Sequence, residues 1–131
     1  MTAAQRRLVS RARRARVRSF APFSKFRVGA AVETPRGRIY TGANIESATY
    51  GLTLCAERVA IFKAVSEGER AFKRVAVVAD TRPLTPPCGA CRQILWEFCG
   101  DVEIVLANPR GRAAVYRLSE LLPHPFDASL L

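Results

Sequence analysis

The chain has 131 residues, of which 49% are hydrophobic and 24% are charged, enough for one domain with its own core and too few for two. No run approaches the roughly 18 consecutive apolar residues of a membrane-spanning helix, and the N-terminus lacks the apolar centre of a secretory signal. We therefore expect a single domain over residues 1–131 in the cytoplasm. In that reducing compartment, four cysteines favour a metal site or catalysis over disulfides.

The net charge of +10 is concentrated at the N-terminus. Residues 1–32 hold nine of the 21 Lys and Arg and no acidic residue, while the remaining residues hold 12 basic and 11 acidic ones. An arginine-rich start of this kind can be an arm for RNA or membrane, or a mitochondrial presequence. The spacing of Leu8, Ala12 and Ala15 favours the solvated face of an ordinary first helix within residues 1–19, so we expect neither a nucleic acid nor a membrane partner.

A hairpin is predicted after this helix. Residues 26–33 and 38–45 have the composition of two antiparallel strands, joined by a tight turn at residues 35–37. The second strand carries Asn44 and Glu46 two positions apart, and the period of a strand would send both side chains to one face.

A second helix is expected to follow the hairpin. Thr53 is a suitable N-cap and Gly68 a suitable stop signal. Within this helix, the row predicted to face the interior contains Cys55, Val59 and Phe62.

The second half of the chain begins with a continuous apolar run over residues 74–80, as in a central strand covered on both faces. The three prolines within residues 81–87 predict a loop, which leads into a helix from Cys88 to about Cys99. One row of that helix contains Cys91, Leu95 and Phe98. Two further strands and a last helical turn are expected at residues 102–107, 113–117 and 119–122.

The expected order αββαβαββα predicts an α/β fold, a three-layer αβα sandwich with a mixed five-stranded sheet. Right-handed crossovers between parallel strands would place the starts of the second and third helices at the same end of the sheet. That arrangement brings together cysteines that are far apart in the sequence.

Three cysteines are candidate metal ligands. Cys55 lies in the first turn of the second predicted helix, and Cys88 and Cys91 lie in the first turn of the third, so three thiolates would meet at the end of the sheet. Three protein ligands and one open position are the arrangement of a catalytic zinc site, and we expect one zinc ion per subunit. A structural site needs a fourth ligand, for which Cys99 and His124 are poorly placed.

Charged residues near the cysteines suggest how the site would work. Helix N-termini stabilise thiolates, and Arg58 or Arg92 can offset their charge, because they follow Cys55 and Cys88 by three and four positions. Glu57 would stand beside the metal without binding it. A carboxylate in that place can carry a proton, so Glu57 is the best catalytic candidate.

These motifs resemble a known family. Cys55-Ala56-Glu57-Arg58, followed by Pro87-Cys88-Gly89-Ala90-Cys91, is similar to the zinc nucleoside deaminases, and specifically to the small homotetrameric cytidine deaminases. The similarity continues through Ser24-Lys25-Phe26 and Asn44-Ile45-Glu46 to Leu121-Leu122-Pro123 with Phe126, which covers most of the chain.

The resemblance implies roles for further residues. Asn44 and Glu46 would hold the ribose 3′-hydroxyl, Phe26 would pack against the pyrimidine, and the backbone N–H of Ala56 would read the base. Phe126 would enter the site of a neighbouring subunit in a homotetramer. Arg58 matches the family position that offsets the charge of the thiolates. Ser47 stands where the family usually has asparagine and Phe23 where a tyrosine is common, and both departures bear on substrate preference.

The leading hypothesis is therefore hydrolytic deamination of cytidine and 2′-deoxycytidine to uridine and 2′-deoxyuridine with release of ammonia, in pyrimidine salvage. One alternative is deamination of a modified cytosine nucleoside, or of cytosine in RNA or DNA. Polynucleotide deaminases usually present histidine where this chain has Cys55, and Glu46 would repel a 3′-phosphate. A second alternative is a non-catalytic zinc-binding module, which lacks a well-placed fourth ligand.

Overall fold

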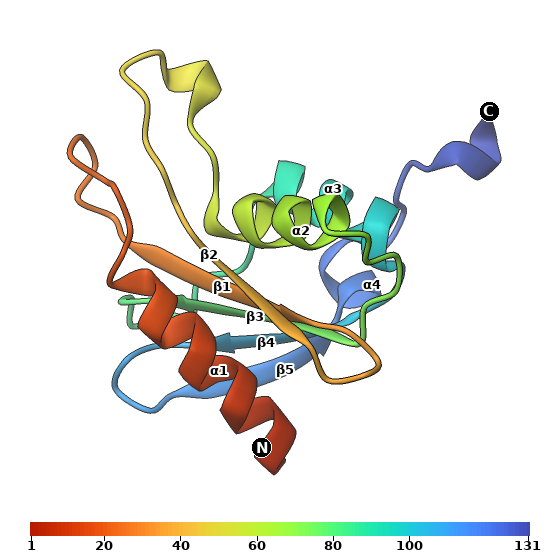
Figure 1. Cartoon of the computed structure of the whole chain (residues 1–131), viewed down its shortest axis with the longest axis horizontal. Helices are drawn as coiled ribbons and strands as arrows, with labels where there is room; N and C mark the ends of the chain where they lie inside the picture. The colour runs from red at the N-terminus through yellow and green to blue at the C-terminus, as the bar shows by residue number, and fades with distance from the viewer.

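The computed structural model describes all residues, 1–131, and confirms the predicted order of helices and strands (Figure 1). In chain order, the elements are α1 (Ala3–Arg16), β1 (Val28–Glu33), β2 (Ile39–Ala43), α2 (Ala56–Ser66), β3 (Arg74–Ala79), α3 (Gly89–Cys99), β4 (Glu103–Ala107), β5 (Ala113–Arg117) and α4 (Leu118–Leu121). Two short 3₁₀ turns, Tyr50–Leu52 and Ala128–Leu130, were not predicted. None of the helices has the length and apolar composition needed to cross a membrane.

The sheet is mixed and five-stranded, in the order β2-β1-β3-β4-β5. β3 and β4 are parallel, and the other neighbouring pairs are antiparallel. Since β1 is antiparallel to both β2 and β3, these two strands run in the same direction. Both α2 and α3 therefore follow strands of one direction, and their N-termini lie at the same end of the sheet, as predicted.

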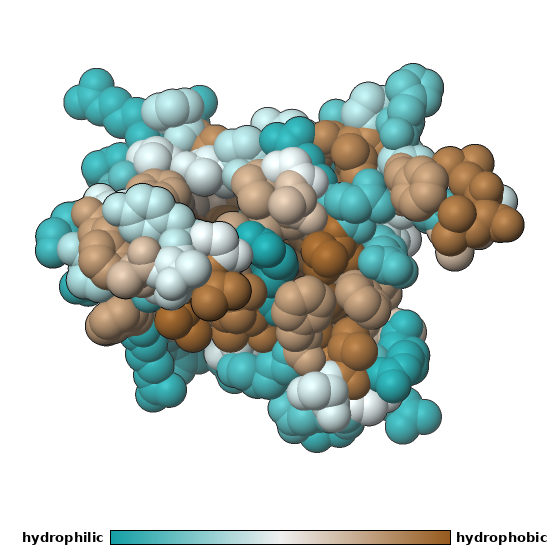
Figure 2. All heavy atoms as spheres, turned by 90° about the horizontal axis from the view of Figure 1, so that it is seen from above, coloured by the Kyte–Doolittle hydropathy of each residue, from teal (hydrophilic) through white to brown (hydrophobic).

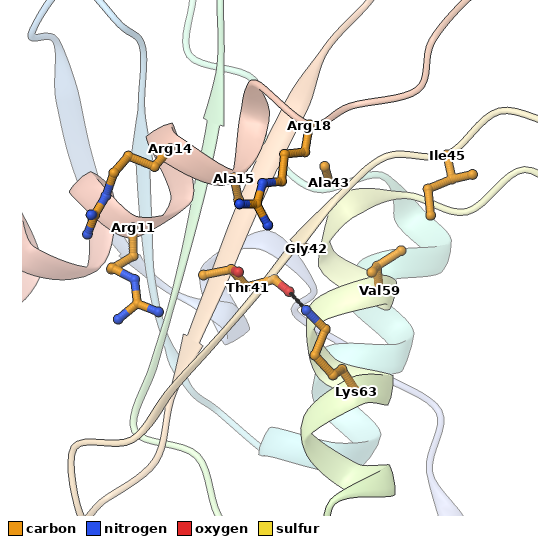
Figure 3. A pocket seen from close by; sticks show the side chains of 10 residues that line it. All are labelled: Arg11, Arg14, Ala15, Arg18, Thr41, Gly42, Ala43, Ile45, Val59 and Lys63. Atoms are coloured by element: carbon orange, nitrogen blue, oxygen red, sulfur yellow. Dashed lines mark hydrogen bonds between the residues drawn. The ribbon is translucent and has the colours of Figure 1, made fainter.

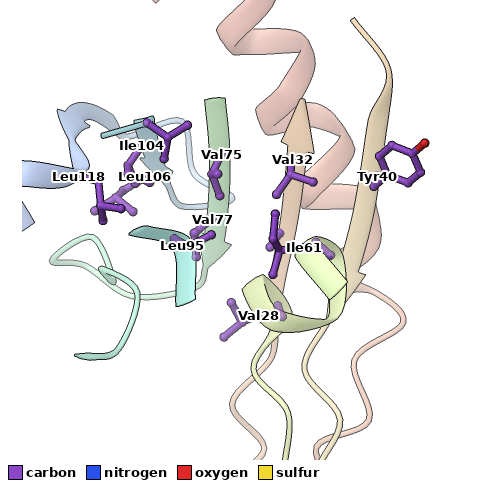
Figure 4. Close-up of a cluster of buried hydrophobic side chains, with 14 of the residues drawn as sticks. Val28, Val32, Tyr40, Ile61, Val75, Val77, Leu95, Ile104, Leu106 and Leu118 are labelled. Carbon is purple, nitrogen blue, oxygen red and sulfur yellow. The ribbon is translucent and has the colours of Figure 1, made fainter. Parts of the chain in front are cut away.

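Helices cover both faces of the sheet, which confirms the three-layer sandwich. α1 lies on one face and packs through Leu8 and Ala12 against small residues such as Ala31 and Ala76. α2, α3 and α4 cover the other face, where the larger cluster includes Val32, Val75, Ile61, Leu95, Ile104 and Leu118 (Figure 4). Successive residues of β1 and β3 alternate between the two clusters, as the pleat of a strand requires.

Contact between α2 and the sheet depends on Gly42 of β2. A Cβ atom built at this position would lie 2.6 Å from the carbonyl oxygen of Ala56 and 2.6 Å from the backbone nitrogen of Ala60. Gly29 of β1 has the same role beneath α1, where a Cβ atom would lie 2.0 Å from the carbonyl oxygen of Ala12. Each helix thus touches the backbone of the sheet directly.

This close contact corrects the predicted orientation of α2. The buried residues of the helix are Ala56, Glu57, Ala60, Ile61 and Ala64. The row that contains Cys55, Val59 and Phe62 does not face the interior, and Phe62 is 39% exposed. Small alanines face the strand because the close approach at Gly42 leaves no room for a larger side chain. The helix also begins later than predicted, with Cys55 rather than Thr53 at the N-cap.

A buried ion network stabilises the opposite end of the sheet. Arg74 is 9% exposed and contacts Glu33 at 2.7 Å and Glu103 at 2.5 Å. From α1, Gln5 Nε2 donates a hydrogen bond to Glu103 at 3.0 Å, and Arg7 lies 3.6 Å from Glu33. The first helix is therefore tied to β1 by an ion pair and to β4 by a hydrogen bond, as well as by apolar packing.

The structure predicts that Gly42→Ala is destabilising. The added methyl group would overlap the backbone of α2, and overpacking of this kind lowers the free energy of unfolding by about 1–3 kcal/mol. Urea denaturation monitored by circular dichroism measures the change. The matched control is Gly51→Ala, because no atom lies within 4 Å of a Cβ atom at that exposed position. Equal stability of the two variants would contradict the packing argument.

Candidate active site

Three of the four cysteines converge at the end of the sheet where α2 and α3 begin. The sulfur atoms of Cys55, Cys88 and Cys91 all lie within 4.8 Å of one another, and all four cysteines are free thiols. Cys55 and Cys88 occupy the N-cap positions of α2 and α3, and Cys91 lies in the first turn of α3. The positive end of a helix dipole stabilises a thiolate at each of these positions.

The three sulfurs have a spacing that suits zinc. Zn–S bonds of about 2.3 Å in a tetrahedral arrangement place two sulfur ligands roughly 3.8 Å apart. The Sγ atoms of Cys55 and Cys88 are 3.9 Å apart. Soft thiolate donors in this geometry are the ligand set that zinc prefers, so the residues present fit the ion.

Arg58 is the cation beside the thiols. Its Nη2 donates a hydrogen bond to Cys55 Sγ at 3.2 Å. Its Nε is buried and has no hydrogen-bond partner. The other predicted candidate, Arg92, points elsewhere and donates to the carbonyl oxygens of Pro87 and Leu121 at 2.7 Å and 2.6 Å. Of the two arginines, only Arg58 contacts a thiol.

The thiols influence one another electrostatically. The neighbouring thiol of Cys91 and the guanidinium of Arg58 lower the pKa of Cys55 to about 5. The same interaction with Cys55, together with burial, raises the pKa of Cys91. Of these two thiols, the one more readily deprotonated is therefore Cys55, whose sulfur contacts Arg58.

Glu57 lies next to these sulfurs in a protected position. The residue is 4% exposed and forms no ion pair. Burial raises its pKa to about 7, and the negative charge of Cys55 contributes in the same direction. A carboxyl group with a pKa near neutrality can both accept and return a proton, which is the property of a general acid–base residue.

Cys55, Cys88 and Glu57 border a small cavity of about 160 Å³. Of the residues predicted from the sequence, the structure brings Phe26, Asn44, Cys55, Ala56, Glu57 and Cys88 together around it. Thr85 and Pro86 also line it and are not among the predicted site residues. Their position directly before Pro87 and Cys88 is the signal that would have identified them.

Asn44 is both a lining residue and a structural one. It is 8% exposed; its Oδ1 accepts a hydrogen bond from the backbone N–H of Val28 at 2.9 Å and one from the Ser19 hydroxyl. Its Nδ2 donates to the carbonyl oxygen of Phe26 at 2.7 Å. Asn44 therefore holds the segment before β1 against the end of β2.

Glu46 lies outside this cavity. Ile45, between Asn44 and Glu46, forms β-bridges with Phe20 and Leu54 beyond the end of β2. Glu46 Oε1 accepts hydrogen bonds from the backbone N–H groups of Phe23 and Ser24 at 2.9 Å and 3.1 Å. It lines a neighbouring cavity of about 410 Å³, and Thr53 borders both cavities.

Three further residues lie away from the thiols. Phe126 is 56% exposed on the C-terminal segment and lines neither of the two cavities. Cys99 is outside the cluster, and burial raises its pKa to about 12. His124 is exposed. Neither Cys99 nor His124 is placed to complete the set of three sulfurs.

Comparison with known proteins gives a consistent result. Residues 2–107 match the model of the cytidine and deoxycytidylate deaminase zinc-binding region. The chain is 50% identical over 122 residues to a cytidine deaminase of Halalkalibacterium halodurans, covering 92% of each chain. It is 48% identical over 122 residues to a cytidine deaminase of Sporosarcina psychrophila, covering 92% of this chain and 90% of the relative.

A solved structure is similar along almost the whole chain. The crystal structure of a cytidine deaminase from Burkholderia pseudomallei superimposes with a TM-score of 0.91 at 43% sequence identity. The alignment covers 96% of this chain and 100% of that one.

The contacts of Asn44 predict that Asn44→Ala lowers stability as well as changing the cavity. The variant would leave the N–H of Val28 and the carbonyl oxygen of Phe26 without their partner, at a cost of about 1–3 kcal/mol in the free energy of unfolding. Chemical denaturation measures this cost. Thr49→Ala is the control, because the exposed Thr49 hydroxyl makes no hydrogen bond, and a loss of the same size there would contradict the prediction.

Proposed function

Because the chain belongs to the cytidine and deoxycytidylate deaminase family and is a hydrolytic deaminase, we propose that its substrates are the free nucleosides cytidine and 2′-deoxycytidine. The products are uridine or 2′-deoxyuridine and ammonia, as in pyrimidine salvage in the cytoplasm. The observation that carries the proposal is a cluster of three thiols, two of which line one small cavity together with a buried carboxyl group. That cavity is also lined by Phe26 and Asn44.

In this proposal, Cys55, Cys88 and Cys91 hold one zinc ion per chain. The ion, when bound, supplies the Lewis acidity that makes water a nucleophile near neutral pH. Three thiolates would leave a zinc ion with a net negative charge, which opposes that effect. Arg58 donates to Cys55 at 3.2 Å and so offsets part of the sulfur charge.

Glu57 moves the protons of the reaction. Hydrolysis forms a C–O bond at C4 of the cytosine ring and breaks the C–N bond to the exocyclic amino group. One proton of the water must reach ring N3, where the product keeps it, and the other must reach the leaving nitrogen, which departs as ammonia. Glu57 is adjacent to the thiols and has a pKa near 7, so its carboxyl group can accept a proton and return it at each transfer.

The other lining residues would orient the nucleoside. Phe26 offers an aromatic face, and the backbone N–H of Ala56 lies in the first turn of α2, where it has no intrahelical partner. Asn44 and Glu46 would bind the ribose 3′-hydroxyl. Glu46 lines the adjoining cavity, and Thr53 borders both cavities. A nucleoside that spans both would place its base in the cavity beside the thiols and its sugar in the cavity beside Glu46.

We also propose that the protein is a homotetramer in which Phe126 completes the site of a neighbouring subunit. Apolar side chains are exposed on the side of the molecule formed by α2, α3 and the loop before α2, where Figure 2 shows extended hydrophobic areas. They include Phe62, at ring-centroid distance 6.1 Å from Phe98 of α3, together with Leu52 and Tyr50 from the loop before α2. Exposed apolar areas of this kind commonly mark interfaces between proteins.

Replacement of Glu57 by Gln tests the proton-transfer role. The amide cannot accept the proton, so the rate of cytidine deamination should fall about 10²–10⁴-fold. The loss of cytidine absorbance over time measures the rate, and elemental analysis should still find one zinc per chain. Cys99→Ala, in which the cysteine outside the cluster is removed, should retain both zinc and activity.

Three outcomes would contradict parts of this proposal. Full activity of Glu57→Gln would remove Glu57 from the mechanism. Zinc retained by a variant lacking both Cys88 and Cys91 would remove these residues from the metal site. Turnover of cytosine in an oligonucleotide at a rate above that of cytidine would replace the free nucleoside as substrate.

Mixing two inactive variants tests whether Phe126 acts between subunits. Glu57→Gln lacks the proton carrier, and Phe126→Ala lacks the aromatic side chain of the exposed C-terminal segment. Hybrid oligomers should recover activity, because some sites combine the intact Glu57 of one subunit with the intact Phe126 of another. Activity of the refolded mixture equal to the mean of the separate variants would contradict a shared site.

A further inference from the structure

A further cavity lies at the edge of the sheet, separate from the thiols (Figure 3). Its volume is about 390 Å³. The C-terminal half of α1, the edge strand β2 and the helix α2 enclose it. None of its lining residues lines the candidate active-site cavity.

Four cationic side chains surround this cavity and no acidic one does. Arg11 and Arg14 belong to α1, Arg18 to the turn that follows it, and Lys63 to α2. In Figure 3, Arg11 and Arg18 lie on one side of β2 and Lys63 reaches the strand from α2 on the other. The charges therefore converge from two helices on one concavity.

The three guanidinium groups are unused donors. None of the four cations forms an ion pair, and the three arginine side chains donate no hydrogen bond within the chain. Lys63 Nζ donates one, to the carbonyl oxygen of Thr41 at 2.5 Å. By contrast, Arg7 of the same helix contacts Glu33, and Arg16 Nε donates to the carbonyl oxygen of Arg27.

Holding these charges together is unfavourable unless an anion is present. Arg11 and Arg14 are three residues apart and so are neighbours on one face of α1, and Arg18 follows in the turn after the helix; like charges this close repel. The negative end of the helix dipole offsets only part of this repulsion, and only in the last turn. A multiply charged anion in the cavity would offset the remainder.

We propose that this cavity binds a small polyphosphate anion, of the class of inorganic triphosphate or the triphosphate group of a nucleotide. Guanidinium groups match phosphate oxygens with paired hydrogen bonds, and lysine adds a point charge. The volume lies within the range of small-molecule sites. The three arginines supply the donors, and Lys63 closes the site from α2.

A nucleic acid is a poorer fit to the same charges. A polynucleotide binds along a continuous basic track, because its phosphates are spread along the strand. The exposed residues Arg6 and Arg13 lie on the opposite side of α1 from Arg11 and do not line the cavity. The unpartnered cations instead line one concavity.

Calorimetric titration of the full-length, zinc-loaded protein tests the proposal. Inorganic triphosphate, ATP and an oligouridylate are titrated separately at about 0.15 M salt. Triphosphate and ATP should each bind to one site per chain. Similar affinities would identify the phosphate chain as the recognised group, and tighter binding of ATP would mean that the nucleoside is recognised as well.

Paired charge-neutralising variants localise the site. Arg11→Gln combined with Arg18→Gln should weaken triphosphate binding about tenfold or more, since two charge-assisted contacts are lost. Folding should be unaffected because neither side chain is bonded within the chain. Arg13→Gln combined with Arg36→Gln removes the same charge outside the cavity and should change the affinity less than about twofold.

Amide chemical shifts provide a second measure that does not depend on the variants. Triphosphate should shift the backbone resonances of Thr41 and Gly42, which line the cavity. The proposal is overturned by the absence of binding, by equal weakening in the two double variants, or by shifts confined to the region of the thiols. Oligouridylate binding stronger than that of triphosphate would also overturn it and would indicate a nucleic-acid surface.

Discussion

The close packing of α2 on the edge of the sheet is the constraint on which the site depends. Gly42 lets the backbone of α2 touch β2, and the alanines of α2 keep the helix there. This contact determines where the helix begins and therefore where Cys55 and Glu57 stand. α3 begins at the same end of the sheet, and the result is three sulfurs within 4.8 Å of one another.

The two ends of the sheet have different roles. At one end, thiols, a buried carboxyl group and Arg58 form a reactive environment whose charges are only partly balanced. At the other end, Arg74 is balanced by Glu33 and Glu103 and ties α1 to the strands. Charges that are only partly balanced at the end with the thiols lower the stability of the fold. The buried network around Arg74 lies at the other end, where it does not interfere with metal or substrate.

One chain supplies an incomplete environment for a nucleoside. The metal ligands, Glu57, Phe26 and Asn44 come together, while Glu46 lies in the adjoining cavity and Phe126 is exposed far along the chain. Apolar side chains remain exposed around the helices that carry the site. Both features have a common explanation if neighbouring subunits cover these surfaces and close the site.

The sequence by itself determined the order of elements, the mixed sheet and the three cysteines, because periodicity, turn residues and ligand spacing are local properties. It also identified Glu57 and Arg58 by their distance from Cys55. Only the tertiary structure decided that alanines rather than Val59 and Phe62 face the sheet, since this depends on the approach of α2 to Gly42. The placement of Glu46 in the adjoining cavity and the position of the arginines near Lys63 likewise depend on how loops and helices pack, which residue spacing does not specify.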